Sequence, residues 1–493
     1  MWPFSPMKPT QPATIPTDTI IPLHFLDDQP VHRSIVLDLT LRFDDALDSE
    51  TLRIALVRLM ELGPWRKLGA RLRMNEAGRL EYHIPTSFDE TRPGFSYTRI
   101  KHDINIKDHP LASRLPKMSS RPSVQANPAD FISLVRRPDA PKKLDDYLFA
   151  DEPQLCLYIV SFEDATLVSL SWPHTFLDAM GMATLLNAWS LVLSGQEDRV
   201  PPFHGFNADP LATLGSTPVE QSMLASYQVT GLGMLGFVAR YMFEQLWWRE
   251  EETRVVCLPH SYLQAMKQTA IQELAAQDAS GSEPFLSDGD IISAWWTRLA
   301  IQHLPRTSTR TILISNGFSL RGVLANDLLP SGTAYMSNAV YAVFAFMSAS
   351  DVFNKPLSYV ASQVRQSIQE QGTREQIEAF AALLKTATEA TGRAPIFGDS
   401  STQMLNFSNW TKGRLFDVDF STASANLKPY PQLMERPNTL GRPSYVQVIT
   451  HLNGFSGRYS FPIFGKDTAG NYWSAGTLRA SQWLGIEEAL KGM

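Results

Sequence analysis

Hydrophobic residues recur with two different periods along this chain. Residues 36–43 (VLDLTLRF) alternate between apolar and polar, which predicts a half-buried strand. In residues 48–62, Leu52, Leu56 and Leu59 recur every three to four positions, which predicts a helix with one buried face. The same criteria predict strands at 65–73, 79–84, 155–162, 166–170, 311–318, 339–346 and 446–452, and helices at 179–193, 261–276, 291–303, 355–371, 373–390 and 480–490. Strands and helices interleave in both halves, so we expect an α/β fold.

The length of the chain predicts two lobes. With 493 residues it is too long for a single hydrophobic core. A stretch rich in Pro, Gly and Ser begins at residue 196 and is typical of a connection between domains. We therefore expect an N-terminal lobe over residues 20–214, a crossover over 215–252 and a C-terminal lobe over 253–493. Each lobe should contain a mixed β-sheet with flanking helices.

Charge and cysteine content exclude several functional classes. The chain has 44 Lys and Arg against 50 Asp and Glu, and no long basic run, so nucleic acid is not an expected partner. Its two cysteines form neither a disulfide framework nor a zinc-binding pair, and the histidines show no metal-ligand spacing. The N-terminus has no basic region followed by an apolar core, so it is no secretory signal. These features predict a cytoplasmic protein without a metal, which we expect to be a monomer.

The longest apolar stretch, residues 231–248, contains Arg240 and Glu244. A transmembrane helix needs about 20 residues with few or no charges, so we expect no transmembrane segment here. The stretch predicts a buried or interfacial helix, and contact with a membrane surface is one alternative for its apolar side chains.

The residues around His174 are the leading candidates for catalysis. His174 and Asp178 follow the strand expected at 166–170 and precede the helix expected at 179–193. Rigid elements on both sides hold loop side chains in place, which favours chemistry at such a position. The non-catalytic interpretation of His174 is a core or capping histidine, and this segment alone does not decide between the two.

His174, Asp178 and Gly181 form the pattern H-x-x-x-D-x-x-G, which resembles the active-site motif of the BAHD family of acyl-CoA-dependent acyltransferases. Residues 408–410 (SNW) resemble the family's Thr-Ser-Trp element, and residues 419–423 (DFSTA) keep the first two letters of its D-F-G-W-G box. Further landmarks follow in the family's order at residues 287–290 (SDGD), 316–321 (NGFSLR) and 335–338 (YMSN). The degraded box resembles fungal members, the branch of secondary-metabolite O-acetyltransferases.

This resemblance implies two coenzyme A-dependent acyltransferase-like lobes with His174 in a channel between them. His174 would act as the general base that takes the proton of a hydroxyl acceptor while it attacks a thioester. The resulting oxyanion needs a hydrogen-bond donor, for which the resemblance offers Trp410 Nε1–H or Ser408 Oγ–H.

The same resemblance makes Asp178 structural rather than a partner of the His174 ring. A buried carboxylate needs a cation, and Arg321 is the first choice. Asp419 is also expected to need a cation, and the sequence leaves open whether Arg321 pairs with Asp178 or with Asp419. Gly181 suggests a close approach of two backbones where the helix starts, and Asn338 is expected to be structural at the site.

By resemblance, the co-substrate is acyl-CoA, with acetyl-CoA the first choice, and no cofactor is held permanently. Lys412 and Arg414 are candidates for its phosphates, with a solvated strand edge as the alternative. The acceptor is expected to be a hydroxylated small molecule such as a terpenoid, meroterpenoid or polyketide. Three alternatives stay open: a non-catalytic ligand-binding relative, a condensation-domain-like enzyme that forms amides, and an unrelated two-domain α/β protein.

Overall fold

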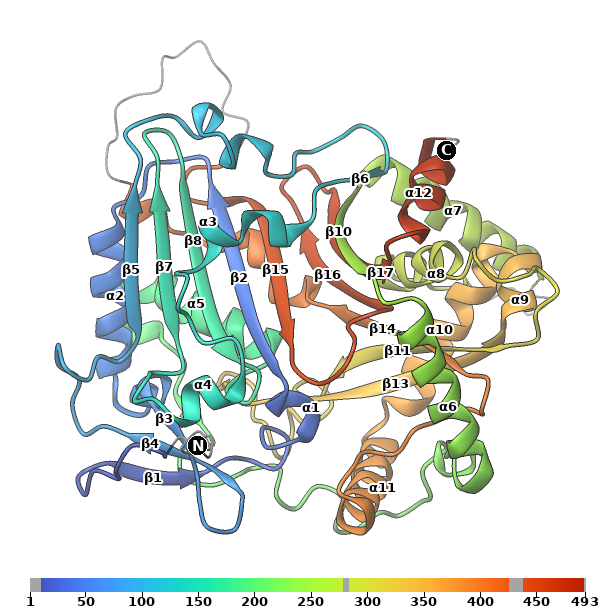
Figure 1. The fold of residues 1–493 in the computed structure, drawn as a ribbon, viewed down its shortest axis with the longest axis horizontal. Helices are drawn as coiled ribbons and strands as arrows, with labels where there is room; N and C mark the ends of the chain where they lie inside the picture. Colours follow the sequence, from blue (N-terminus) through green and yellow to red (C-terminus); the bar gives the residue numbers. More distant parts are fainter. Residues whose placement is uncertain (1–9, 278–282, 425–437, 492–493) are drawn as a thin grey trace, which may run out of the picture.

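The computed structural model describes residues 10–277, 283–424 and 438–491. Within these ranges most strands join one of two large mixed sheets, each with helices packed against it (Figure 1). The two sheets lie side by side and form the cores of two lobes (Figure 1). The expected α/β class and two-lobed architecture are confirmed.

The first sheet carries the segment that leads to His174. Its strand order is β15–β2–β8–β7–β5, with the bounds Pro443–Leu452, Ile35–Phe43, Thr166–Pro173, Cys156–Ser161 and Ser96–Lys101. β8 lies in the middle, antiparallel to both neighbours, and is buried along its whole length. Helices α2 (Ser49–Glu61) and α5 (Ala179–Leu193) pack on one another and bury their leucines in the core of this sheet. The strand before His174 and the helix after it are therefore both rigid.

The second sheet forms the other lobe. Its strand order is β13–β11–β14–β16–β17–β10–β6, with the bounds Val340–Ser348, Thr311–Ser319, Gln403–Asn409, Ser460–Lys466, Tyr472–Arg479, Glu251–Leu258 and Ser123–Val124. Helices α7 (His260–Gln277), α8 (Asp288–Ala300) and α10 (Leu357–Gln371) pack together beside it (Figure 1). Trp296 of α8 lies 5.0 Å from Phe461 of β16, ring centre to ring centre, in the core between helices and sheet.

The two lobes exchange strands. β15 comes late in the chain but joins the first sheet beside β2, where Val446 pairs with Leu41. In return β6, from the first half of the chain, pairs with β10 of the second sheet through Val124 and Val256. Because each lobe completes the sheet of the other, the groove between them has walls whose relative position is fixed by backbone hydrogen bonds.

Smaller elements complete the described chain. The remaining strands are β1 (Thr19–Pro22), β3 (Arg71–Met74), β4 (Leu80–Ile84), β9 (Phe203–His204) and β12 (Ala334–Tyr335). The remaining helices are α1 (Pro30–Arg33), α3 (Ile132–Val135), α4 (Leu144–Leu148), α6 (Gly231–Trp247), α9 (Ala349–Asn354), α11 (Arg374–Thr391) and α12 (Gln482–Lys491).

Three expected elements differ from the structure. The strand expected to be half-buried over residues 36–43 is β2, which is buried on both faces, because Asp38 and Thr40 are buried as well as the apolar residues between them. The strand expected at 65–73 begins only at Arg71, because Pro64 lies in the first turn of a 3-10 helix over Gly63–Gly69. The stretch 231–248 does form a helix, α6, but none of its residues is buried, so the buried alternative is wrong. In the described part of the chain, no helix has the length and apolar character that a membrane span requires.

Candidate active site

Hydrogen bonds from both lobes hold the backbone of His174, which directly follows β8. Pro173 is the last residue of the strand, and the His174 N–H donates to the Ile35 carbonyl at 2.9 Å. The His174 carbonyl accepts from Asn338 Nδ2 at 2.8 Å. Asn338 lies beside β13 of the second sheet, so the two lobes fix this residue jointly.

The imidazole of His174 stacks on a second histidine that the sequence analysis missed. The ring of His32, on α1, lies 4.5 Å from the ring of His174, centre to centre, and nearly parallel to it. His32 Nδ1 lies 2.5 Å from the Leu26 carbonyl, which only accepts, so Nδ1 carries the proton. Burial and the neighbouring His174 lower the pKa of His32 to about 3. His32 is therefore a neutral ring of fixed tautomer at neutral pH.

His174 itself is held neutral by its surroundings. Burial lowers the pKa of His174 below its usual value, and the residue's own backbone carbonyl and the nearby carboxylate of Asp178 offset this only in part. The Nδ1 atom is buried and has no hydrogen-bond partner among the described residues. His174 lines a cavity, so the nitrogen able to meet a substrate is Nε2.

Asp178 faces an arginine and backbone amides. Its carboxylate accepts from Arg321 Nη1 at 2.9 Å and Nη2 at 3.0 Å, and from the N–H groups of Gly181 at 2.8 Å and Ala339 at 2.9 Å. Burial alone would raise the pKa of Asp178, but Arg321 and these hydrogen bonds outweigh it and lower the pKa. The carboxylate caps α5 and ties it to the second lobe.

The choice left open for Arg321 is thus resolved in favour of Asp178. Asp419 is exposed, and its carboxylate accepts from the Ser421 N–H at 2.9 Å. The expectation that Asp419 is a buried carboxylate in need of a cation is wrong, because the chain around it turns this side chain to solvent. Gly181 does lie at a close backbone approach, since a Cβ at this position would collide with the Met336 carbonyl.

Asn338 also connects His174 to a buried aspartate that the sequence analysis missed. Asp27 Oδ1 accepts from the backbone N–H of Asn338 at 2.8 Å and from its Nδ2 at 2.7 Å. Burial raises the pKa of Asp27 to about 7. Asp27 and His32 lie in a segment without hydrophobic periodicity; its one signal was Pro30, typical of the first position of a helix.

One cavity of about 1540 Å³ joins the two lobes. His174 lines it from the first lobe, and Ser408 and Trp410 line it from the end of β14 in the second. Trp410 Nε1 donates to Ser408 Oγ at 2.8 Å. The single indole proton of Trp410 is thereby engaged, whereas the hydroxyl proton of exposed Ser408 remains available to a ligand.

The two candidates for phosphate binding also line this cavity. Lys412 and Arg414 are both exposed, and Arg414 forms an ion pair with Asp417 at 2.5 Å. Arg442 lines the same cavity and lies 3.5 Å from the other oxygen of Asp417. Three basic side chains thus line the cavity after Trp410 in the chain, and two acidic ones, Asp417 and Asp419, line it with them.

Comparisons with known proteins identify the family of this chain. The model of the Transferase family matches residues 139–428. "Acetyltransferase adrJ" of Penicillium rubens is 41% identical over 98% of both chains, and "Transcriptional regulator calD" of Penicillium decumbens is 45% identical over 99% of this chain and 98% of its own. A crystal structure of TRI101 of F. graminearum, complexed with coenzyme A and T-2 mycotoxin, covers 96% of this chain and 97% of its own at 15% identity and a TM-score of 0.66. The chain therefore belongs to the Transferase family, the BAHD-type acyltransferases.

Proposed function

We propose that the protein transfers an acyl group, in the first instance acetyl, from acyl-CoA to a hydroxyl of a small secondary metabolite. A terpenoid, meroterpenoid or polyketide is the class of acceptor. The acetyltransferase names of the relatives support the acyl group, and the coenzyme A in the TRI101 structure supports the donor. Two relatives are named as transcriptional regulators; with a net charge of −6 and no basic run, this chain gives that function no support.

The observation that carries the proposal is the shared cavity. It places a neutral imidazole, His174, and a free hydroxyl donor, Ser408, on walls that come from different lobes. A volume of about 1540 Å³ exceeds the ~300–1,000 Å³ of common ligand pockets, so it has room for two substrates at once. Donor and acceptor can then meet at His174 without a covalent enzyme intermediate.

In the proposed reaction, His174 Nε2 takes the proton of the acceptor hydroxyl as its oxygen attacks the thioester carbonyl. The negative charge that develops on the carbonyl oxygen is stabilised by Ser408 Oγ–H, which Trp410 orients. The C–S bond then breaks, and the imidazolium returns its proton to the leaving thiolate. The backbone around His174 is held in position by four further residues, Asp178, Gly181, Arg321 and Asn338.

Lys412 and Arg414 are our candidates for the phosphates of the donor. Both lie on the rim of the cavity, and Arg414 would have to exchange Asp417 for a phosphate.

We further propose that the enzyme works as a cytoplasmic monomer and holds no permanent cofactor.

The test is thiol release from acetyl-CoA in the presence of a panel of hydroxylated terpenoids, meroterpenoids and polyketides. Wild type is compared with His174→Ala and with His260→Ala, a matched control because His260 is an exposed histidine at the start of α7. We expect at least one acceptor to stimulate thiol release by wild type and His260→Ala, and none to stimulate His174→Ala.

Release by His174→Ala at the wild-type rate would overturn the role of His174. If wild type stays silent, binding of coenzyme A is measured by calorimetry. Binding without turnover would point to an acceptor or acyl chain outside the panel. Failure to bind coenzyme A would favour the non-catalytic relative, which the degraded box at residues 419–423 also suggests.

A further inference from the structure

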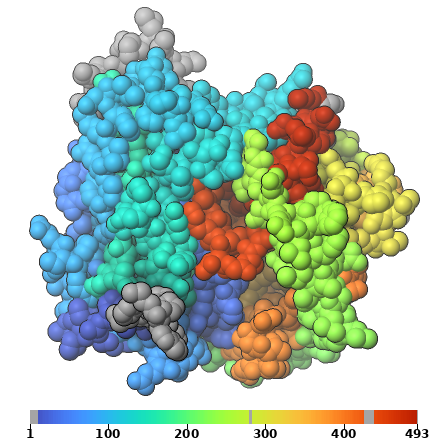
Figure 2. Space-filling model, viewed as in Figure 1, coloured from blue at the N-terminus to red at the C-terminus, as the bar shows by residue number. Residues whose placement is uncertain are grey.

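Helix α6 turns its apolar side chains to solvent. Leu232 is 85% exposed, Leu235 67% and Trp247 70%. Together with further exposed residues they form a stripe with helical spacing, which we call the outer stripe; its members are Leu232, Leu235, Val238, Met242, Phe243, Leu246 and Trp247. Figure 2 shows α6, in bright green, standing on the surface of the second lobe. Apolar stripes of surface helices normally face the core, whereas this one faces solvent.

The face of α6 that meets the protein is mixed: Met234 and Phe237 are half-buried on it, and so is Glu244. Glu244 forms ion pairs with Arg310 at 2.9 Å and with Arg479 at 3.3 Å. Arg240 Nε donates to the Ser400 carbonyl at 3.3 Å. These charged and polar contacts help to hold the helix on the lobe, while the side chains of the outer stripe remain exposed.

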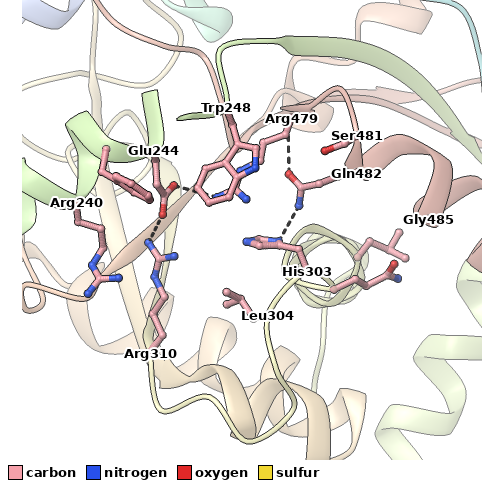
Figure 3. Close-up of a pocket in the computed structure, with 13 residues that line it drawn as sticks. Arg240, Glu244, Trp248, His303, Leu304, Arg310, Arg479, Ser481, Gln482 and Gly485 are labelled. Carbon is pink, nitrogen blue, oxygen red and sulfur yellow. Dashed lines mark hydrogen bonds and ion pairs between the residues drawn. The ribbon is translucent and has the colours of Figure 1, made fainter. Parts of the chain in front are cut away.

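A pocket of about 630 Å³ opens at the C-terminal end of the outer stripe (Figure 3). Its charged lining residues are three arginines, Arg240, Arg310 and Arg479, against the single carboxylate of Glu244. Arg479 is 5% exposed, its guanidinium lies 3.7 Å from the centre of the Trp248 ring, and its Nε has no hydrogen-bond partner within the described ranges. The pocket therefore carries excess positive charge in a partly buried setting.

The outer stripe and this pocket are continuous. Phe243 belongs to the stripe and also lines the pocket, and Trp248 of the pocket directly follows Trp247 of the stripe. His303, in the pocket wall, adds no charge, because burial and Arg479 lower its pKa to about 4. Apolar side chains beside a basic pocket are the two features that a lipid bilayer with anionic headgroups recognises.

We propose that α6 docks the enzyme on a membrane surface that contains anionic phospholipids. The outer stripe would enter the boundary between headgroups and acyl chains, and the arginine pocket would take a lipid phosphate. A second copy fits less well, because a two-fold contact across α6 would bring two positively charged pockets together. Glu250 and Glu251, exposed after the helix, oppose the anionic lipid, so the stripe should contribute more than the pocket.

The test is flotation of the full-length protein with vesicles of phosphatidylcholine alone or mixed with phosphatidylserine. We expect wild type to float with both and several-fold better with the mixture. Leu235→Gln combined with Leu246→Gln should lower the bound fraction at least tenfold on both. Arg240→Gln should remove most of the gain from phosphatidylserine. The matched control is Leu484→Gln, a 70% exposed leucine on α12 outside the stripe, which should float like wild type.

All substituted side chains are exposed, and equal melting temperatures would show that the variants fold. The proposal is overturned if wild type floats with neither vesicle, or if the stripe variant floats like wild type. Light scattering after size exclusion gives a further outcome. If wild type is a dimer and the stripe variant is a monomer, the stripe would contact a second copy of the chain instead of a membrane.

Discussion

Removal of the Asp178 carboxylate should destabilise the junction of the lobes. In Asp178→Ala, two guanidinium N–H groups of Arg321 and the backbone N–H groups of Gly181 and Ala339 lose their acceptor. Deleting one partner of a buried ion pair costs about 3–5 kcal/mol. The lower end applies here, because Arg321 keeps its bonds to the carbonyls of Tyr335 and Ser337.

Loss of the helix cap adds about 1 kcal/mol, so the total is about 4 kcal/mol. An entropy of unfolding of about 2.1 cal/mol/K per residue gives about 1 kcal/mol/K for 493 residues. If the chain unfolds as one unit, the melting temperature should fall by about 4 °C. A larger fall would mean that one lobe unfolds alone.

The assay is differential scanning calorimetry at pH 7 on wild type, Asp178→Ala and the matched control Asp419→Ala. Asp419 is exposed and accepts a single bond from Ser421, so its removal should move the melting temperature by less than about 1 °C. The folded pKa of Asp178 is lowered from 3.8. Its contribution is therefore complete above about pH 4 and is lost as the pH falls through the folded pKa. Equal melting temperatures for wild type and Asp178→Ala would refute the structural role.

Three further predictions concern the site. The pKa of His174 is lowered from 6.5 and the base works deprotonated, so the fall of kcat/KM at low pH should be centred below pH 6.5; a fall centred above this pH would contradict the burial argument. Ser408→Ala should lower kcat by about 10²–10³-fold. Trp410→Phe should lower kcat less, because the indole N–H of Trp410 acts through Ser408. If the indole were the direct donor, steady-state kinetics would show the larger loss in Trp410→Phe. Gly181→Ala should lower the melting temperature, because its Cβ meets the Met336 carbonyl, and an unchanged value would mean that α5 can shift.

The local pattern of the sequence sufficed for the elements that carry His174. The apolar run of β8 and the helical spacing of α5 are signals within one segment, so both were predicted close to their bounds. The turn at Pro64 was missed, because apolar residues such as Trp65 are equally compatible with a buried strand and a buried 3-10 turn.

Long-range partners could not be predicted in the same way. A period of two says that β15 is a strand but not that it crosses to the first sheet and pairs with β2. His32 is far from His174 in the sequence, and only the folded structure brings the two rings together. For α6 the apolar spacing was correct, but the direction of the stripe depends on Arg310 and Arg479, which lie far from the helix in sequence.

In the proposed site, no carboxylate pairs with the general base His174. This suits both the removal of the acceptor's proton and its return to the leaving thiolate. A carboxylate on Nδ1 would raise the pKa of His174 and hold the proton on the ring. Here Asp178 pairs with Arg321, no carboxylate of the described residues bonds to Nδ1, and a neutral His32 covers the ring face. The resulting base is weaker, but its imidazolium is a stronger acid and returns the proton readily to the leaving thiolate. The nearby Asp178 carboxylate offsets only part of this effect, because it is paired with Arg321.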